Sequence, residues 1–279
     1  MAAPIEERFT EIDGIRLFLR ERHGAGPPTI WVHGNPTHSA EWLPFLEALE
    51  GPAIALDLPG FGRSARPEPG CFDHSVGAYG RLLADAFAEL APDGYRLVVH
   101  DWGVLGLLAA QARPPEEIQR LVVIDAVPFT SAYRWHWMAR CWRRRGLGEQ
   151  LARPRSRLLT GQLLRLARPG RKAMPPGFVD MVLEHWDAGM SHAILGLYRS
   201  ADPGVLEAAG ERLGEIRCPA LVVWGDSDPY ISAADGRLYE RALPGARFLE
   251  AEQAGHWPWI DRPDLIAAIA DFLSAGDEE

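Results

Sequence analysis

Short apolar runs alternate with amphipathic segments at both ends of the chain, and this alternation limits the possible folds more than any other feature. The apolar runs cover residues 29–33, 53–57, 96–100, 121–124, 220–224 and 248–251, and helical periodicity covers 40–49, 75–90, 103–112, 235–243 and 263–274. Continuous apolar strands are typical of a parallel sheet that helices cover on both faces. We therefore predict an α/β fold with a mostly parallel sheet, opened by an antiparallel hairpin of residues 9–12 and 15–19.

The strand pattern stops between residues 128 and 215, where helical periodicity continues between Pro-containing breaks. This stretch holds 14 basic and 8 acidic residues, a net charge of +6, whereas the rest of the chain carries −15. We predict that residues 128–215 form an inserted helical cap and that residues 1–127 and 216–279 form the core domain.

Composition excludes several classes of function. The net charge of −9 disfavours a basic nucleic-acid-binding surface. Cys71, Cys141 and Cys218 form no Cys-x-x-Cys pair, which argues against a disulfide framework and a cysteine zinc site. No apolar stretch is long enough for a membrane helix, and the first ten residues lack the apolar region of a signal peptide. We expect a soluble cytoplasmic protein; the sequence leaves its oligomeric state open.

Four loops that follow predicted strands carry the residues suited to chemistry: HGNP (33–36), HDWG (100–103), WGDSDP (224–229) and AGHWP (254–258). Open α/β sheets bind their ligands at this end of the strands. The HDWG loop has the pattern of a nucleophile elbow, with Asp101 at the position that usually holds Ser. An Asp before a helix is often only a helix cap, but an elbow needs no cap at that position.

Together with DLPGFGRS (57–64), these motifs resemble the Asp-nucleophile branch of the α/β-hydrolase superfamily, which includes haloalkane dehalogenases and epoxide hydrolases. The resemblance covers nearly everything outside the predicted cap. It implies the α/β-hydrolase fold, Asp101 as nucleophile, His256 as base and Asp228 as the acid that orients the base. Asp125, at the end of the strand after the elbow helix, is the alternative acid, because some dehalogenases take their acid from that position.

An Asp nucleophile is suited to displacement at an sp³ carbon. A carboxylate oxygen of Asp101 replaces the leaving group and forms an alkyl ester, and water deprotonated by His256 then attacks the ester carbonyl. The backbone N–H groups of Asn35 and Trp102 are the expected oxyanion hole. Side chains and backbone supply all of this chemistry, so we expect neither a metal nor an organic cofactor.

The resemblance leaves the leaving group open. Haloalkane dehalogenases hold the departing halide with two side-chain N–H donors, which Trp102 and Asn35 match. Epoxide hydrolases protonate the opening oxygen with cap tyrosines, for which Tyr198 and Tyr133 are the candidates.

Two further cap residues, His136 and Trp137, loosely resemble the fluoride-holding residues of fluoroacetate dehalogenases. Those enzymes have Arg after the nucleophile, where this chain has Trp102, which argues against a small carboxylate substrate. The aromatic residues of this segment are equally explained by an amphipathic helix that buries them. We expect a small apolar substrate, a haloalkane before an epoxide, and we retain a non-catalytic ligand-binding protein as a minor alternative because the fold also hosts such relatives.

Overall fold

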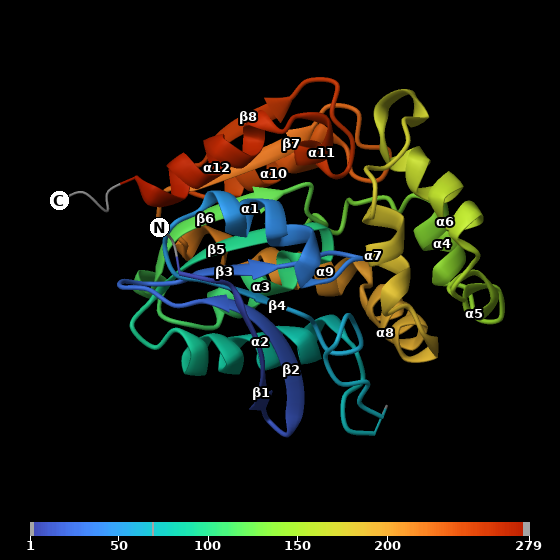
Figure 1. Ribbon diagram of the computed structural model, residues 1–279, viewed down its shortest axis with the longest axis horizontal. Coiled ribbons are helices and arrows are strands. Elements are labelled where there is room, and N and C mark those ends of the chain that lie inside the picture. Colours follow the sequence, from blue (N-terminus) through green and yellow to red (C-terminus); the bar gives the residue numbers. More distant parts are fainter. Residues whose placement is uncertain (1–2, 69, 276–279) are drawn as a thin grey trace.

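The computed structural model describes residues 3–68 and 70–275, and one eight-stranded sheet forms its centre (Figure 1). The strands are β1 (Glu6–Ile12), β2 (Ile15–Arg22), β3 (Thr29–Val32), β4 (Ala53–Leu56), β5 (Tyr95–His100), β6 (Ile118–Ile124), β7 (Ala220–Gly225) and β8 (Arg247–Ala251). Their spatial order is β1-β2-β4-β3-β5-β6-β7-β8. β1 and β2 form an antiparallel hairpin, β2 pairs antiparallel with β4, and all other neighbours pair in parallel. The predicted sheet and its opening hairpin are therefore confirmed.

Helices cover both faces of the sheet, because successive strand residues point to opposite sides. On β3, Ile30 and Val32 join the apolar cluster beneath α2, α3 and α10, whereas Trp31 joins the cluster beneath α1 and α12. The helices outside residues 128–215 are α1 (Leu43–Ala48), α2 (Val76–Leu90), α3 (Leu105–Gln111), α10 (Ala233–Ala242), α11 (Pro258–Asp261) and α12 (Asp264–Ser274). Three 3₁₀ turns accompany them: η1 (Ser39–Trp42), η2 (Asp101–Val104) and η3 (Pro115–Glu117). β3, β4, β5 and β7 are buried at every residue, which explains their continuous apolar sequences.

Residues 128–215 are all described, and they contain helices but no strand. They form α4 (Trp137–Trp142), α5 (Leu147–Leu151), α6 (Arg157–Leu164), α7 (Phe178–Glu184), α8 (Ala188–Ser200) and α9 (Pro203–Gly210), with η4 (Arg165–Ala167), η5 (Pro169–Arg171) and η6 (Leu213–Glu215). Helices α4 to α8 lie together beside the sheet, on the right in Figure 1. The Gln111 side chain of α3 donates to Ala209 O at 2.8 Å, so α9 is attached to the core. The cap boundary at residue 215 stays a prediction.

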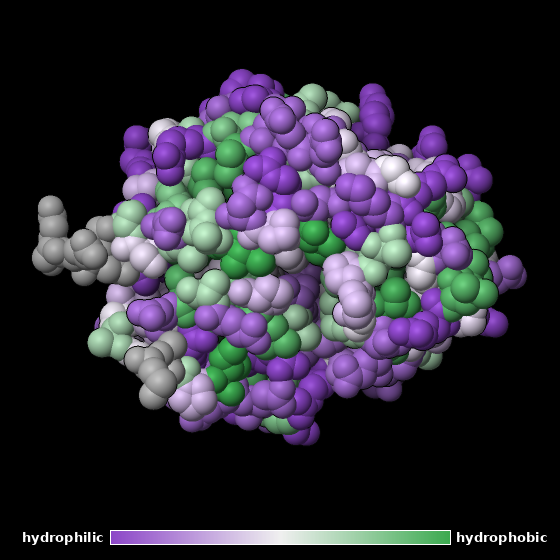
Figure 2. Space-filling model, turned by 45° about the horizontal axis from the view of Figure 1, so that its top comes forward, coloured by the Kyte–Doolittle hydropathy of each residue, from purple (hydrophilic) through white to green (hydrophobic). Residues whose placement is uncertain are grey.

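The face shown in Figure 2 is mostly hydrophilic, with separate apolar patches. Leu158 of α6 is the most exposed large apolar side chain among the described residues, at 76%. Within the same part of the chain, no helix combines the length and apolarity that crossing a bilayer requires.

Candidate active site

Asp101 follows the last residue of β5 and begins the 3₁₀ turn that leads into α3. Its φ of +48° lies in the left-handed region, which non-glycine residues adopt mainly at strained or functional positions. A Cβ at Gly103 would lie 2.0 Å from Val32 O, so glycine is required for the turn to approach β3. This is the predicted strand, sharp turn and helix of an elbow. The N-cap of the turn is His100, without a side-chain cap bond, so Asp101 is not a helix cap.

The two carboxylate oxygens of Asp101 have different environments. Oδ2 accepts a hydrogen bond from the backbone N–H of Asn35 at 2.8 Å, and the backbone N–H of Trp102 also hydrogen-bonds to this carboxylate. Oδ1 lies 3.8 Å from His256 Nε2. Burial raises the pKa of Asp101, while the His256 and His100 rings and the two N–H groups oppose that rise. The Asn35 N–H therefore holds Oδ2, and Oδ1 faces His256.

His256 lies in the loop between β8 and α11 and is 2% exposed. Its Nδ1 lies 2.8 Å from Asp228 Oδ2, and the other oxygen of Asp228 accepts hydrogen bonds from the backbone N–H groups of Tyr230 (2.7 Å) and Ile231 (3.3 Å). Burial lowers the pKa of His256, but the charge and hydrogen bond of Asp228 raise it by more, so the pKa of His256 is above its ordinary value. With Nδ1–H donated to Asp228, Nε2 is the nitrogen that faces Asp101.

Asp125 lies behind this pair, at the end of β6. Its carboxyl accepts a hydrogen bond from Gly225 N–H at 3.1 Å and hydrogen-bonds to the Asp228 side chain. Burial and the adjacent Asp228 carboxylate raise the pKa of Asp125 well above its ordinary value. The structure therefore places Asp228 against His256 and Asp125 in a supporting position.

Two buried side-chain N–H donors meet next to Asp101. The Asn35 Nδ2 donates to the Tyr198 hydroxyl at 3.4 Å. The Trp102 ring lies 5.1 Å from the Tyr198 ring, and its Nε1 is buried with no close hydrogen-bond acceptor among the described residues. Burial and then the Asp101 charge raise the pKa of Tyr198 well above its ordinary value, while the side chains of Trp102 and Asn35 oppose that rise. Both side chains therefore lie beside Tyr198, where the Asn35 donor has an acceptor and the Trp102 donor has none among the described residues.

The remaining cap candidates have less direct positions. The Tyr133 hydroxyl donates to Tyr230 O at 3.2 Å. His136 is the N-cap of α4, where its Nδ1 accepts from Ala139 N–H at 3.4 Å. Trp137 is 50% exposed, although it lines the same cavity as the other two. The structure thus brings Tyr198 to the Asp101 side of the cavity and holds Tyr133 and His136 through backbone contacts.

A cavity of about 290 Å³ is lined by Asp101, His256 and Asn35 and by residues of helices α4, α5, α6 and α8, among them Trp142 and Tyr198. Most of its wall is apolar, including Val127, Trp135, Met138, Leu151, Leu163 and Trp186. Such a lining is typical of a pocket for a small apolar molecule. Tyr230 also lines it, with its ring perpendicular to His256 at 5.0 Å. The sequence analysis missed Tyr230, although its place directly after the WGDSDP motif was a signal.

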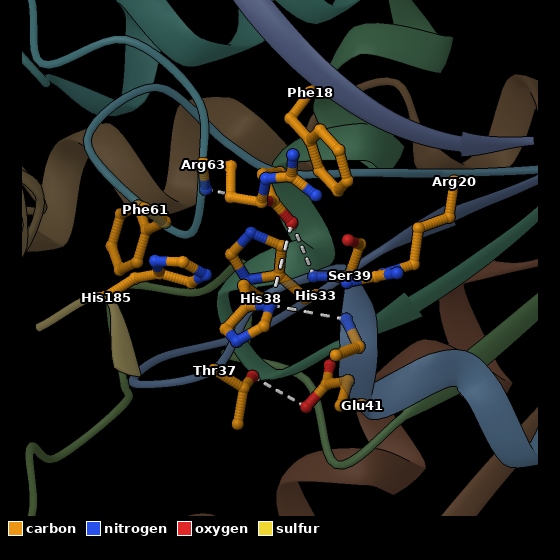
Figure 3. A network of polar contacts seen from close by, with 12 residues as sticks. Phe18, Arg20, His33, Thr37, His38, Ser39, Glu41, Phe61, Arg63 and His185 are labelled. Carbon is orange, nitrogen blue, oxygen red and sulfur yellow. Dashed lines mark hydrogen bonds and ion pairs between the residues drawn. The ribbon is translucent and has the colours of Figure 1, made fainter. Parts of the chain in front are cut away.

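The DLPGFGRS motif supports the loop that carries Asn35. Asp57 accepts hydrogen bonds from the backbone N–H groups of Ser39 and Arg63, both at 2.7 Å (Figure 3). His33 Nε2 accepts from Leu58 N–H at 3.0 Å, which joins the two loops a second time. The motif therefore positions the HGNP loop and contributes no side chain to the cavity lining.

One group of possible metal ligands lies outside the cavity: His38, Glu184 and His185 each place a ligand atom within 4.8 Å of the others. Both ring nitrogens of His38 already have backbone partners, Met181 O at 3.1 Å and Ala40 N–H at 3.4 Å. We assign no metal to this group.

Comparison with known proteins identifies the family. The model of the alpha/beta hydrolase family matches residues 30–269. The chain belongs to the alpha/beta hydrolase family. This hydrolase is 30% identical to a haloalkane dehalogenase of Mycobacterium marinum, over 87% of this chain and 82% of the relative. It is also 30% identical to a haloalkane dehalogenase of Mycolicibacterium paratuberculosis, over 92% and 87% of the two chains.

Solved structures confirm the α/β-hydrolase fold that the motifs predicted. The hydrolase resembles the Cif epoxide hydrolase from Acinetobacter nosocomialis with a TM-score of 0.83 and 18% identity, over 98% of this chain and 90% of that one. It resembles the haloalkane dehalogenase DatA from Agrobacterium tumefaciens with a TM-score of 0.81 and 22% identity, over 95% and 94%. At these identities the likeness concerns the fold and does not separate the two activities.

Proposed function

We propose that this hydrolase is a haloalkane dehalogenase that acts through an ester on Asp101. The observation that carries the proposal is that two buried side-chain N–H donors, those of Asn35 and Trp102, lie beside Tyr198 next to Asp101, and that the Trp102 donor has no acceptor among the described residues. A departing halide is an anion without a proton, so it needs donors and gains most from them in a buried site. The sequence relatives named as haloalkane dehalogenases support the same reaction.

In the first step Asp101 Oδ1 attacks the carbon that bears the halogen. Oδ1 is the suitable atom because it faces His256, whereas Oδ2 already accepts a hydrogen bond from Asn35 N–H. The carbon–halogen bond breaks with its electron pair on the halide, and the new carbon–oxygen bond forms an alkyl ester. The halide moves to the N–H donors of Asn35 and Trp102. There it either displaces the Tyr198 hydroxyl or accepts hydrogen bonds beside it.

In the second step water attacks the ester carbonyl and gives its proton to His256 Nε2. Negative charge then develops on Oδ2, which Asn35 N–H already contacts at 2.8 Å. Asp228 stabilises the imidazolium that forms, through the 2.8 Å contact with Nδ1. Collapse of the intermediate releases the alcohol, whose oxygen takes the proton back from His256, and the Asp101 carboxylic acid that forms loses its proton to solvent.

Epoxide hydrolysis is the second candidate, and the position of Tyr198 favours it. Its hydroxyl accepts a hydrogen bond from Asn35 Nδ2 at 3.4 Å, Tyr198 lines the cavity together with Asp101, and a phenol is protonated at neutral pH. A protonated phenol donates a proton to the oxygen of an opening epoxide. The same Asp101 and His256 steps then yield a diol.

Replacement of His256 by Phe tests the shared mechanism, because it removes the base and traps the ester. We expect the intact mass to rise by the alkyl group of a haloalkane, without halogen, or by a whole epoxide. Peptide mapping should place the adduct on Asp101. Absence of an adduct with broad panels of both compounds would contradict the mechanism.

Paired variants separate the two leaving groups. Asn35→Ala removes one halide donor, and we expect it to slow dehalogenation by about 100-fold while epoxide opening changes little. Tyr198→Phe removes the proton donor, and a large loss confined to epoxide opening would favour the second candidate. Equal activity of both variants on both substrate classes would show that neither side chain stabilises a leaving group.

A further inference from the structure

Glu41 is a charged residue in the interior that the proposed chemistry does not use. It lies in η1, and its side chain is 0% exposed. A buried carboxylate is costly unless several donors surround it. The contacts of Glu41 show which groups compensate this charge and which segments those groups belong to.

Three hydrogen-bond donors and one histidine ring nitrogen surround the carboxylate. Oε1 accepts from Gly34 N–H at 3.2 Å, and Oε2 accepts from the Thr37 hydroxyl at 2.6 Å and from Trp257 Nε1–H at 3.2 Å (Figure 3 shows the Thr37 contact). His100 Nδ1 lies 3.4 Å from Oε1. The donors come from three loops that are far apart in the sequence.

Three of these partners are chain neighbours of the residues that carry the proposed reaction. Gly34 directly precedes Asn35, and His100 directly precedes Asp101. Trp257 directly follows His256. The Glu41 carboxylate thus links the loop of Asn35, the turn of Asp101 and the loop of His256.

The hydrogen bonds also indicate where a proton lies. His100 Nε2 is 2.8 Å from the carbonyl oxygen of His256, and a carbonyl only accepts, so Nε2 carries a proton. A bare Nδ1 would then direct its lone pair toward the Glu41 carboxylate, in an interior where both side chains are 0% exposed. Burial raises the pKa of Glu41, but the His100 ring and the Thr37 hydroxyl together lower it by more, so the pKa of Glu41 is below its ordinary value. A proton on Nδ1 as well would face Glu41 Oε1 at 3.4 Å, where opposite charges attract although no hydrogen bond to Nδ1 is formed.

We propose that the Glu41 carboxylate and a doubly protonated His100 ring form a buried ion pair that positions the loops of Asn35, Asp101 and His256. The pair also places a fixed positive charge beside the nucleophile. That charge opposes the effect of burial on the pKa of Asp101 and so favours its ionised, nucleophilic form. Only this catalytic consequence rests on the proposed function.

Nitrogen-15 NMR of histidine-labelled protein tests the ion pair without reference to activity. We expect both ring nitrogens of His100 to be protonated at pH 7 in the wild type. In Glu41→Gln we expect one nitrogen to lose its proton, because the balancing charge is gone. A wild-type His100 with an unprotonated Nδ1 would overturn the ion pair.

Steady-state kinetics test the positioning role. We expect Glu41→Gln to lower kcat by up to about 100-fold, the loss typical of a displacement of about 1 Å at reacting atoms. KM should change little, because Glu41 does not line the cavity. Glu47→Gln, an exposed Glu in α1, is the matched control and should match the wild type. An unchanged kcat in Glu41→Gln would refute the positioning role.

A second variant covers the case in which Glu41→Gln does not fold. Trp257→Phe removes a single donor to Glu41 and keeps an aromatic ring, and we expect a smaller drop of kcat. If the wild type turns over neither haloalkanes nor epoxides, the proposed function fails, and the NMR result still decides the ion pair.

A separate observation at the cap end of the cavity bears on the substrate. Arg153 and Arg155, in the segment between α5 and α6, line the cavity that Asp101 also lines. Neither guanidinium pairs with a carboxylate among the residues that the structure describes, although Arg155 donates to Leu151 O at 3.5 Å, whereas Arg157 and Arg199 nearby pair with acidic side chains. Figure 1 shows α5 and α6 at the outer edge of the cap, away from the sheet.

We also infer that the substrate is an apolar chain with an anionic group at the end remote from the reacting carbon. The apolar wall suits the chain, and the two guanidinium groups that have no carboxylate partner suit a carboxylate at its far end. The assignment of the reacting end to Asp101 rests on the proposed function.

Calorimetric binding of an unreactive alkanoate and of the alkanol of equal length tests this inference without turnover. We expect the alkanoate to bind about tenfold more tightly to the wild type, as one charge-assisted hydrogen-bonding site allows. Arg153→Gln with Arg155→Gln should abolish the difference, whereas Arg145→Gln, an exposed cap Arg outside the cavity, should preserve it. Equal binding of both ligands, or a preference that survives the double variant, would overturn the inference.

Discussion

Asp125→Asn changes a single property of the site, because Asn keeps the shape of the side chain and removes its titratable proton. The Asp125 carboxyl is buried between Gly225 N–H and the Asp228 side chain, and its pKa is raised well above the ordinary value. An Asn amide supplies an acceptor for Gly225 and a donor for Asp228. Asn also tolerates the φ of +37° at this position. We therefore expect the variant to fold and to keep most of its activity.

The magnitude of the stability change follows from proton linkage. In the unfolded chain an Asp ionises near pH 4, whereas the native state holds Asp125 protonated to higher pH. The native state then binds one proton more than the unfolded state, so this group lowers stability by about 1.4 kcal/mol for each unit that the pH rises. Asp125→Asn removes that slope. Between pH 5 and pH 7 its stability relative to the wild type should rise by up to about 2.7 kcal/mol.

Urea unfolding at pH 5, 6 and 7, followed by the fluorescence of the 10 tryptophans, measures this difference. Asp271→Asn in α12 removes an exposed carboxyl and is the matched control, which should follow the wild type at each pH. Parallel pH dependences of the wild type and Asp125→Asn would refute the reasoning, because they would show that Asp125 is ionised in the native state. Asp228→Asn serves as the contrast in activity, with an expected loss of kcat of up to about 10⁴-fold from the wrong His256 tautomer.

Three further outcomes are expected. Arg168→Met leaves the Asp261 carboxylate, which is 1% exposed, without its ion-pair partner, so the free energy of unfolding measured in urea should fall by about 3 kcal/mol. Arg157→Met breaks an exposed ion pair and should shift the urea midpoint far less. Equal shifts in the two variants would argue against burial as the cause. Gly34→Ala places a Cβ 2.5 Å from the Asp101 Cβ and should abolish ester formation in the mass assay. Gly51→Ala is the control, because the space around Gly51 is open, and ester formation should continue. A normal rate of ester formation in Gly34→Ala would contradict the tight packing. Ester hydrolysis requires neutral His256, so kcat should rise with pH through a midpoint above about 6.5, and a lower midpoint would show that Asp228 does not raise the pKa of His256.

Much of the core could be predicted from local patterns. β3, β4 and β5 lie within one residue of their predicted bounds, because continuous apolar runs between turn residues have few other stable arrangements. The elbow was also predictable, since Asp101 and Gly103 stand at a fixed spacing after a strand. The cap was less so: α4 begins only at Trp137, and Tyr133 lies before it in a turn. Helical periodicity does not tell which face of a short helix meets the core.

The sequence by itself determined the elements, the order of the motifs and the types of side chain at the ends of the strands. Only the tertiary structure decided which of these side chains meet: Asp228 and not Asp125 contacts His256 Nδ1, and Tyr198 comes to Asn35. Glu41 shows the limit most clearly, because the segment 40–49 gave no reason to bury one of its acids, yet this residue joins three distant loops. The physical reason is that backbone preference and periodicity act over a few residues, whereas contacts between distant side chains depend on strand order, register and loop packing.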